Sequence, residues 1–234
     1  CWKAGGPSVT NNAGSITSQV SANQDAGFSI ATWSGDGGAG NDIGHGLGKK
    51  PSLWIVKRRN VVNDWPVYTD VNDGSLDFLY LNLANPIGNS SLPISELTSS
   101  TIPVGNVNGE NYVAYIWAEV KNFSKVGTYV GNGDDNGPMI ECGFKPAWVI
   151  VKRITTGANE GWPIYDNVRG SYNPNPKGIY TNSSIAENDA SGRYKDFLSN
   201  GFKIRGTSGE QNTSGIKYLY MAFAESPFQT ANAK

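Results

Sequence analysis

The only histidine of this chain, His45, is the first residue whose type could support chemistry. It lies in the segment Gly44-His45-Gly46-Leu47-Gly48. A metal site usually combines two or more His or Cys ligands, and a Ser-His-Asp triad needs a histidine held by an acid. Glycines on both sides orient an imidazole loosely and are typical of a turn that enters a strand. We therefore interpret His45 as structural and predict no catalytic residue and no metal site.

Carboxylates are the second group that could support catalysis. A glycosidase needs two carboxyl groups about 5–10 Å apart across a sugar. Glu119 and Glu225 end equivalent segments of an internal repeat, so we expect them to lie far apart, and Asp166 follows a Trp-Pro-Ile-Tyr block. Lone carboxylates at strand ends are usually solvated surface groups. The sequence therefore predicts that the protein is not an enzyme, with a glycoside hydrolase as the alternative.

Two acidic segments could offer oxygen ligands to calcium. Asp134-Asp135-Asn136-Gly137 and Asn72-Asp73-Gly74 lack the full spacing of a dedicated calcium loop, and Asx-Gly pairs are typical of turns. The basic runs Lys57-Arg58-Arg59 and Lys152-Arg153 end strands, where we expect them to meet solvent. The sequence therefore predicts no metal and no cofactor.

A polar segment in the second half of the chain has the composition of a recognition loop. It reads Arg169-Gly170-Ser171-Tyr172-Asn173-Pro174-Asn175-Pro176 and is an insertion relative to the first copy of the repeat. Aromatic residues shared by both copies are expected in the core, whereas an aromatic on a polar insertion is explained less well by burial. The predicted ligand-contact residues are Trp162, Tyr165, Arg169, Tyr172 and Asn173.

The composition limits the class of protein further. Lys and Arg total 19 against 20 Asp and Glu, and this balance lacks the basic excess of a nucleic-acid binder. No apolar run reaches the roughly 18 residues of a transmembrane helix. The 29 Gly and 12 Pro favour short strands joined by tight turns. Cys1 and Cys142 are expected to be free thiols. We predict no nucleic-acid partner and no membrane insertion.

The chain contains two diverged copies of one unit. Four blocks recur in the same order: 51–58 as 146–153, 65–68 as 162–165, 112–119 as 218–225, and Phe28-Ser29 as Phe123-Ser124. Because the order is kept and only loop lengths change, the two copies should share one fold.

The repeated blocks are predicted to be strands. Residues 28–33 alternate apolar and small polar side chains, the pattern of a half-buried strand. Residues 52–56 and 147–151 are short apolar runs typical of central strands. Pro66 and Pro163 cannot donate to a β-ladder, so their strands are expected at an edge or a bulge. The sequence predicts an all-β protein of two tandem antiparallel β-sandwich (jelly-roll-like) units.

The predicted units span residues 28–120 and 121–234. Residues 1–27 are expected to hold the end of a preceding unit, a linker and an extra strand. The opening Cys1-Trp2-Lys3-Ala4 aligns with the last strand of both copies, at 116–119 and 222–225. We therefore expect the chain to be the final part of an array.

A set of motifs resembles a known family. The motifs are Gly27-Phe28-Ser29-Ile30, Gly44–Gly48 followed by Pro51, Ile55-Val56-Lys57, and the closing block 112–119. As a set they resemble a repeated domain of tail-fibre-like, virion-associated proteins of marine bacteriophages. The second copy departs from this pattern, with Glu141-Cys142-Gly143-Phe144 in place of the His-Gly-Leu stretch. The resemblance implies an extracellular place on the virion, other virion proteins as partners and a homo-oligomer, by analogy a trimer.

These observations together predict a non-catalytic virion fibre or adhesion module. It would bind a host cell-surface glycan or protein through its loops. One alternative is a tailspike-like enzyme that degrades polysaccharide, in which acids would cluster in a groove. The other is a passive capsid decoration or spacer protein without a ligand.

Overall fold

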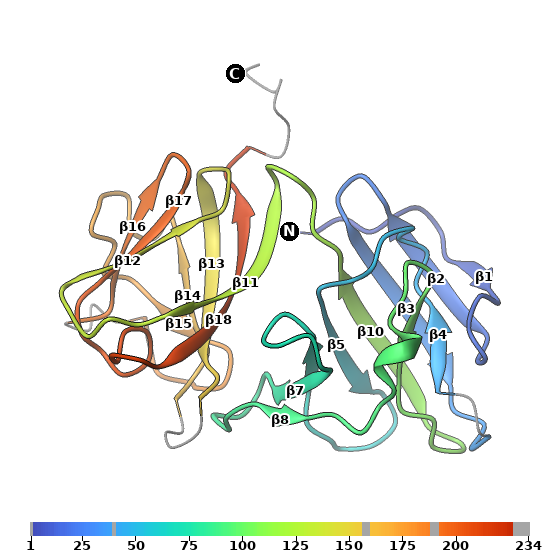
Figure 1. The fold of residues 1–234 in the computed structure, drawn as a ribbon. Coiled ribbons are helices and arrows are strands. Elements are labelled where there is room, and N and C mark those ends of the chain that lie inside the picture. Colours follow the sequence, from blue (N-terminus) through green and yellow to red (C-terminus); the bar gives the residue numbers. More distant parts are fainter. Residues whose placement is uncertain (1, 39–40, 156–159, 188–191, 227–234) are drawn as a thin grey trace. The chain divides into compact units, whose positions relative to one another are not determined.

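The protein is all-β and is built of antiparallel sheets, as seen in a computed structural model that describes residues 2–38, 41–155, 160–187 and 192–226. The chain divides into two compact units (Figure 1). The first unit contains Cys1–Leu81 and Gly88–Val120, and the second contains Asn82–Ile87 and Lys121–Lys234. The prediction of an all-β fold with antiparallel sandwich units is confirmed.

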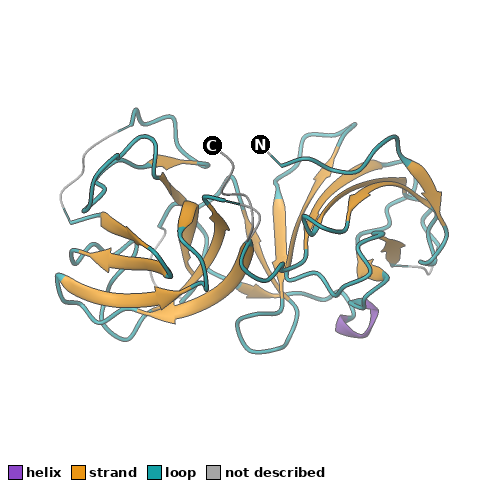
Figure 2. Ribbon diagram, turned by 90° about the horizontal axis from the view of Figure 1, so that it is seen from above, coloured by secondary structure: helices purple, strands orange, loops and turns teal. Residues whose placement is uncertain are grey.

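The first unit has one large sheet and one small sheet, and Figure 2 shows its short helical turn η1 in purple. The large sheet has the order β1-β2-β3-β10-β5-β6-β7-β8, and β4 pairs with β9 in the small one. The elements are β1 (Val9–Asn11), β2 (Ser18–Asn23), β3 (Phe28–Ser34), β4 (Asp42–Gly44), β5 (Leu53–Arg58), β6 (Pro66–Thr69), β7 (Asp77–Tyr80), β8 (Gly88–Asn89), η1 (Ile94–Glu96), β9 (Thr101–Pro103) and β10 (Asn111–Trp117).

The second unit has the same plan with different additions. Its five-stranded sheet has the order β11-β18-β13-β14-β15, and its three-stranded sheet has the order β12-β17-β16. The strands are β11 (Ser124–Val130), β12 (Asn136–Glu141), β13 (Pro146–Arg153), β14 (Pro163–Asp166), β15 (Ile179–Tyr180), β16 (Tyr194–Leu198), β17 (Gly201–Arg205) and β18 (Lys217–Ala224).

Each unit has its own hydrophobic core between its two sheets. In the first unit, Ala114 and Ile116 of β10 belong to the same buried cluster as Ile43 of β4 and Ile102 of β9. The second unit repeats this arrangement with residues of β18 and β13 against residues of β12 and β17. Alternate residues of a strand share one face, so the period-2 sequence pattern produces these cores directly. Each fully buried large apolar side chain contributes about 1.5–3 kcal/mol.

The two units correspond strand for strand. The order β3-β10-β5-β6 of the first unit matches β11-β18-β13-β14 of the second, and β4 pairs with β9 as β12 pairs with β17. Tyr112 of β10 is paired with Trp33, and its counterpart Tyr218 is paired with Tyr129. Strands β1, β2 and β8 have no counterpart among the described strands of the second unit, and β16 has none in the first.

The register corrects one sequence alignment. Phe28 is paired with Trp117, whereas Ser124 is paired with Phe223, the counterpart of Trp117. Phe28 therefore corresponds to Ser124 and not to Phe123. The shared Phe-Ser sequence conceals this shift of one residue, and such a shift exchanges the two faces of a strand.

The expectation that the Trp-Pro strands lie at an edge or a bulge is wrong. β6 lies between β5 and β7, and β14 lies between β13 and β15. Pro66 and Pro163 are each the first residue of their strand, where a missing N–H can be tolerated.

The first residues form no strand. Trp2, Lys3 and Ala4 are irregular, and Cys1 lies outside the described residues. The Trp2 ring nevertheless packs against Trp117, with 5.5 Å between ring centroids, although its side chain is 43 % exposed. In the described residues no helix is long and apolar enough to cross a membrane.

Candidate functional site

The five residues predicted to contact a ligand divide into a buried pair and an exposed group. Trp162 and Tyr165 are each only 2 % exposed, so their rings belong to the interior of the second unit. Arg169, Tyr172 and Asn173 are exposed residues, and the Tyr172 side chain has 68 % of its area in solvent. Only the second group can meet a ligand without rearrangement.

The loop that carries the exposed group is held at both ends. Asp166 Oδ1 accepts hydrogen bonds from the backbone N–H of Val168 at 3.1 Å and of Arg169 at 2.8 Å. The buried Asn175 donates its side-chain amide to the Asp166 carbonyl at 2.7 Å. Asn175 also exchanges backbone hydrogen bonds with Lys195 of β16, at 2.7 and 3.1 Å. A polar loop anchored in this way presents its tip in a fixed conformation.

Asn173 and Arg169 differ from Tyr172 in their surroundings. The Asn173 side chain donates to the Phe197 carbonyl at 3.0 Å and accepts from the Phe197 N–H at 2.9 Å, so it anchors the loop. The Arg169 guanidinium is paired with Asp166 at 2.8 Å and with Glu187 at 3.3 Å. Tyr172 remains as the exposed aromatic ring of the loop, three residues after Arg169.

A lysine Nζ lies over the ring of each repeated tryptophan, Trp65 in the first copy and Trp162 in the second. Lys152 Nζ donates to the carbonyls of Glu160 at 2.6 Å and Ala84 at 2.9 Å, and lies 6.0 Å from the Trp162 ring centroid. Lys57 lies 5.5 Å from the Trp65 ring. The expectation that Lys152 meets solvent is wrong, since it is fully buried, and burial lowers its pKa to about 8.

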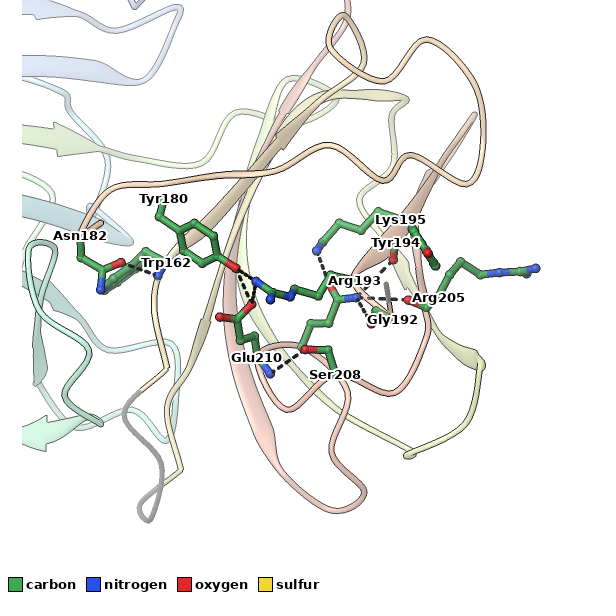
Figure 3. Close-up of polar contacts among 11 residues, drawn as sticks. Trp162, Tyr180, Asn182, Gly192, Arg193, Tyr194, Lys195, Arg205, Ser208 and Glu210 are labelled. Atoms are coloured by element: carbon green, nitrogen blue, oxygen red, sulfur yellow. Dashed lines mark hydrogen bonds and ion pairs between the residues drawn. The ribbon is translucent and has the colours of Figure 1, made fainter. Parts of the chain in front are cut away.

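A second polar cluster of the second unit was not predicted from the sequence (Figure 3). The Tyr180 hydroxyl donates to Glu210 Oε2 at 2.6 Å, and Arg193 is paired with the same oxygen at 2.9 Å. Arg193 also donates to the Tyr180 hydroxyl. Burial, followed by the hydrogen bond to Glu210, raises the pKa of Tyr180. The phenol therefore stays protonated and serves as a donor.

Lys195 completes this cluster from β16. It is fully buried, donates to Gln211 Oε1 and lies 3.5 Å from the Tyr165 ring centroid. Gln211 in turn donates its amide towards the carbonyls of Tyr194 and Arg205, at 3.3 and 3.2 Å (Figure 3). Burial lowers the pKa of Lys195 well below its usual range.

The polar groups of this cluster bind one another. The cluster is therefore better described as a filled interior than as a reactive site. The strand pattern around Lys195 does indicate that this lysine is buried. Lys195 and Phe197 are the two buried positions of β16, so the lysine occupies the core-facing register of a strand.

His45 is buried and fixed by backbone groups. Its Nδ1 accepts from the Leu47 N–H at 3.2 Å, and its Nε2 faces the Thr98 carbonyl at 3.4 Å. This pattern fits the neutral tautomer with the proton on Nε2. Burial lowers the pKa of His45 to about 4. The side chain therefore connects the β4 region to the loop before β9.

The carboxylates form no metal-binding cluster within the part of the chain that the structure describes. Glu225 is paired with Lys145 at 2.8 Å, and Glu119 is an exposed residue of the other unit. Cys142 is buried, and its thiol forms no disulfide bond among the described residues.

The first unit has two clefts that the sequence did not predict. One has a volume of about 440 Å³ and lies beside Trp33, Asp36 and Arg59. The other has a volume of about 390 Å³, and its walls include Tyr68, Phe78 and Tyr80. Both volumes fall within the range of small-molecule sites, about 300–1,000 Å³.

Comparison with known proteins identifies a family. The chain belongs to the family described as domain of unknown function DUF7483, whose model matches residues 1–227. No curated protein and no solved structure matches the chain.

Proposed function

We propose that the protein is a non-catalytic adhesion module of a virion fibre that binds a glycan or a protein on the host cell surface. The observation that carries this proposal is the anchored loop around Tyr172. It presents a 68 % exposed aromatic ring on a backbone fixed through Asp166, Asn173 and Asn175. A rigid loop loses little entropy on binding, and Tyr and Arg are residue types that dominate binding energy at interfaces.

The rest of the proposal follows from the resemblance to tail-fibre-like proteins. Under this proposal the protein would lie outside the cell as part of a virion, beside other virion proteins and in a homo-oligomer such as a trimer. The family that matches the chain has no stated function, so the loop is the structural support for this assignment.

The test is the double variant Arg169→Ala/Tyr172→Ala. We expect it to weaken binding to immobilised bacterial surface polysaccharides or envelope proteins by about 1–3 kcal/mol. Its melting temperature should stay nearly unchanged, because both side chains lie at the surface. The matched control is Lys145→Ala, which removes another surface ion pair of the second unit, 2.8 Å from Glu225.

Two results would contradict the proposal. A double variant that loses thermal stability but binds normally would show that Tyr172 packs against protein, for example a neighbouring subunit. Release of soluble reducing ends from a bound polysaccharide would favour the tailspike-like enzyme instead.

A further inference from the structure

The second cleft of the first unit, here called the aromatic cleft, is built on three adjacent strands of the large sheet. Its lining includes Tyr68 of β6, Phe78 and Tyr80 of β7, and Arg58 of β5. The three aromatic residues are partly exposed. Their rings are fixed: Trp54 stacks on Tyr68 with 5.5 Å between centroids, and Phe78 meets Tyr80 edge-on at 5.5 Å. The cleft therefore has preorganised aromatic walls.

The remaining lining is polar and offers no unpaired cation. Hydrogen-bonding side chains come from Asn63, Asp64 and the segment 89–91. Arg58 is the only cationic residue of the lining, and its guanidinium is paired with Glu110 at 2.8 and 3.1 Å. An anionic ligand would find this charge already compensated. Amide, hydroxyl and carboxylate groups next to aromatic faces suit a neutral ligand with many hydroxyl groups.

The place in the second unit that corresponds to the aromatic cleft can be found from its tyrosines. Tyr68 is paired with Trp54 on β5, and Tyr165 is paired with Val149 on β13, so the two tyrosines correspond. Tyr80 and Tyr180 correspond likewise, since each is paired with the proline that begins the neighbouring strand.

In the second unit polar side chains contact both of these tyrosines, and Tyr165 is buried while Tyr180 is partly exposed. Lys195 lies 3.5 Å from the Tyr165 ring centroid. Arg193 and Glu210 bind the Tyr180 hydroxyl (Figure 3). Tyr165 is thus covered by the chain itself, whereas its counterpart Tyr68 lines an open cleft.

The two units differ here in two ways: β16, which carries Lys195, has no counterpart among the described strands of the first unit, and one corresponding position carries different residues. Asn106 accepts from the Asp36 N–H at 2.9 Å, and Asn212 accepts from the Asn132 N–H at 2.9 Å, so these asparagines correspond. The residue before each is Gly105 in the first unit and Gln211 in the second. Gln211 holds Lys195 in place, whereas Gly105 lines the aromatic cleft, and a Cβ atom added there meets nothing within 4 Å.

We propose that the aromatic cleft binds a residue of a neutral saccharide, with a ring face against Tyr68 or Tyr80 and its hydroxyls against the polar rim. The proposal rests on the proposed surface-binding function and adds to it a second site and the chemical class of its ligand. The first unit would recognise the sugar, while the loop of the second unit makes a separate contact.

The test uses the full chain and two cleft variants. Tyr80→Ala removes one aromatic wall. Gly105→Gln introduces the side chain that the second unit carries, at a position with open space for it. The matched control is Gly6→Gln, since a Cβ atom at Gly6 also meets nothing within 4 Å. Thermal unfolding checks that each variant is folded. The probe is an array of neutral and acidic oligosaccharides, followed by calorimetric titration of the best neutral binder.

We expect both cleft variants to lose affinity for the neutral saccharide by at least about 10-fold, and the control to stay within about twofold. The Arg169→Ala/Tyr172→Ala variant should keep saccharide affinity. Three results would overturn the proposal: no saccharide bound, only acidic saccharides bound, or unchanged binding by folded cleft variants. If the loop variant alone loses binding, the cleft proposal fails while the proposed function stands. If only the cleft variants lose affinity for the neutral saccharide, the cleft proposal holds, and the loop assignment is decided by the separate binding assay on immobilised surface polysaccharides or envelope proteins.

Discussion

Because the His45 imidazole is buried, we predict that the stability of the first unit depends on pH and that His45 dominates this dependence. The pKa of His45 falls from 6.5 to about 4 because burial disfavours the charged ring. Its Nδ1 already accepts a hydrogen bond from the Leu47 N–H, so a proton on Nδ1 would face a donor. In the unfolded chain the same ring titrates normally near 6.5.

The sign and size of the effect follow from this difference. Below pH 6.5 the unfolded chain binds a proton at His45, whereas the folded chain does not bind one until about pH 4. The contribution of His45 to the unfolding free energy is therefore fully present above pH 6.5 and is lost as the pH falls. Between pH 7 and pH 5 the loss is about 2 kcal/mol. Most carboxylates titrate below this window. His45 is the chain's only histidine, so no other imidazole contributes.

Two measurements check this prediction. Urea unfolding at pH 7 and pH 5 should show the loss for the first unit, and a His45→Asn variant should show a much flatter profile. The nuclear magnetic resonance signal of the His45 ring in the folded protein should not shift between these pH values. Burial also raises the pKa of Glu96, which acts in the opposite sense, so Glu96→Gln serves as a control. A ring signal that titrates near pH 6.5 would refute the reasoning.

Three further predictions concern stability. Lys195→Ala should lower the unfolding free energy of the second unit by about 2–4 kcal/mol in denaturant titrations, since it leaves a cavity and an unpaired Gln211 oxygen; an unchanged midpoint would contradict the assigned contacts. Trp162→Ala should lower the unfolding free energy of the second unit by about 3–5 kcal/mol. A loss of binding without a loss of stability would instead identify Trp162 as a ligand-contact residue. Gly35→Ala should destabilise the first unit in thermal scans, because its Cβ would lie 2.1 Å from the Val107 carbonyl oxygen. Gly6→Ala is its neutral control.

The strands and the repeat could be predicted from the sequence because both are local signals. Alternation along 28–33 and the recurrence of 51–58 as 146–153 are contained in the order of residues alone. The aromatic residues at Trp162 and Tyr165 were visible too, but their burial was not. Whether an aromatic ring lies in a core or on a surface depends on what packs against it from distant segments.

The position of each strand in its sheet was beyond local pattern. Pro66 suggested an edge, yet β7 pairs beyond β6 and makes the strand internal. A missing N–H removes one hydrogen bond but does not prevent a neighbouring strand from pairing. Only the long-range strand pairing therefore decided whether the strand lies at an edge.

The sequence by itself determined the all-β class, the two related units and the polar loop around Tyr172, because these follow from periodicity, repetition and composition. Only the tertiary structure decided which groups meet. Lys195, Gln211 and Tyr165 come from separate segments and fill the second unit, while Gly105 opposite Tyr68 and Tyr80 lines a cleft in the first. The additional strand β16 and the Gln211 side chain separate the filled interior of the second unit from the open cleft of the first, and only the tertiary fold brings these segments together.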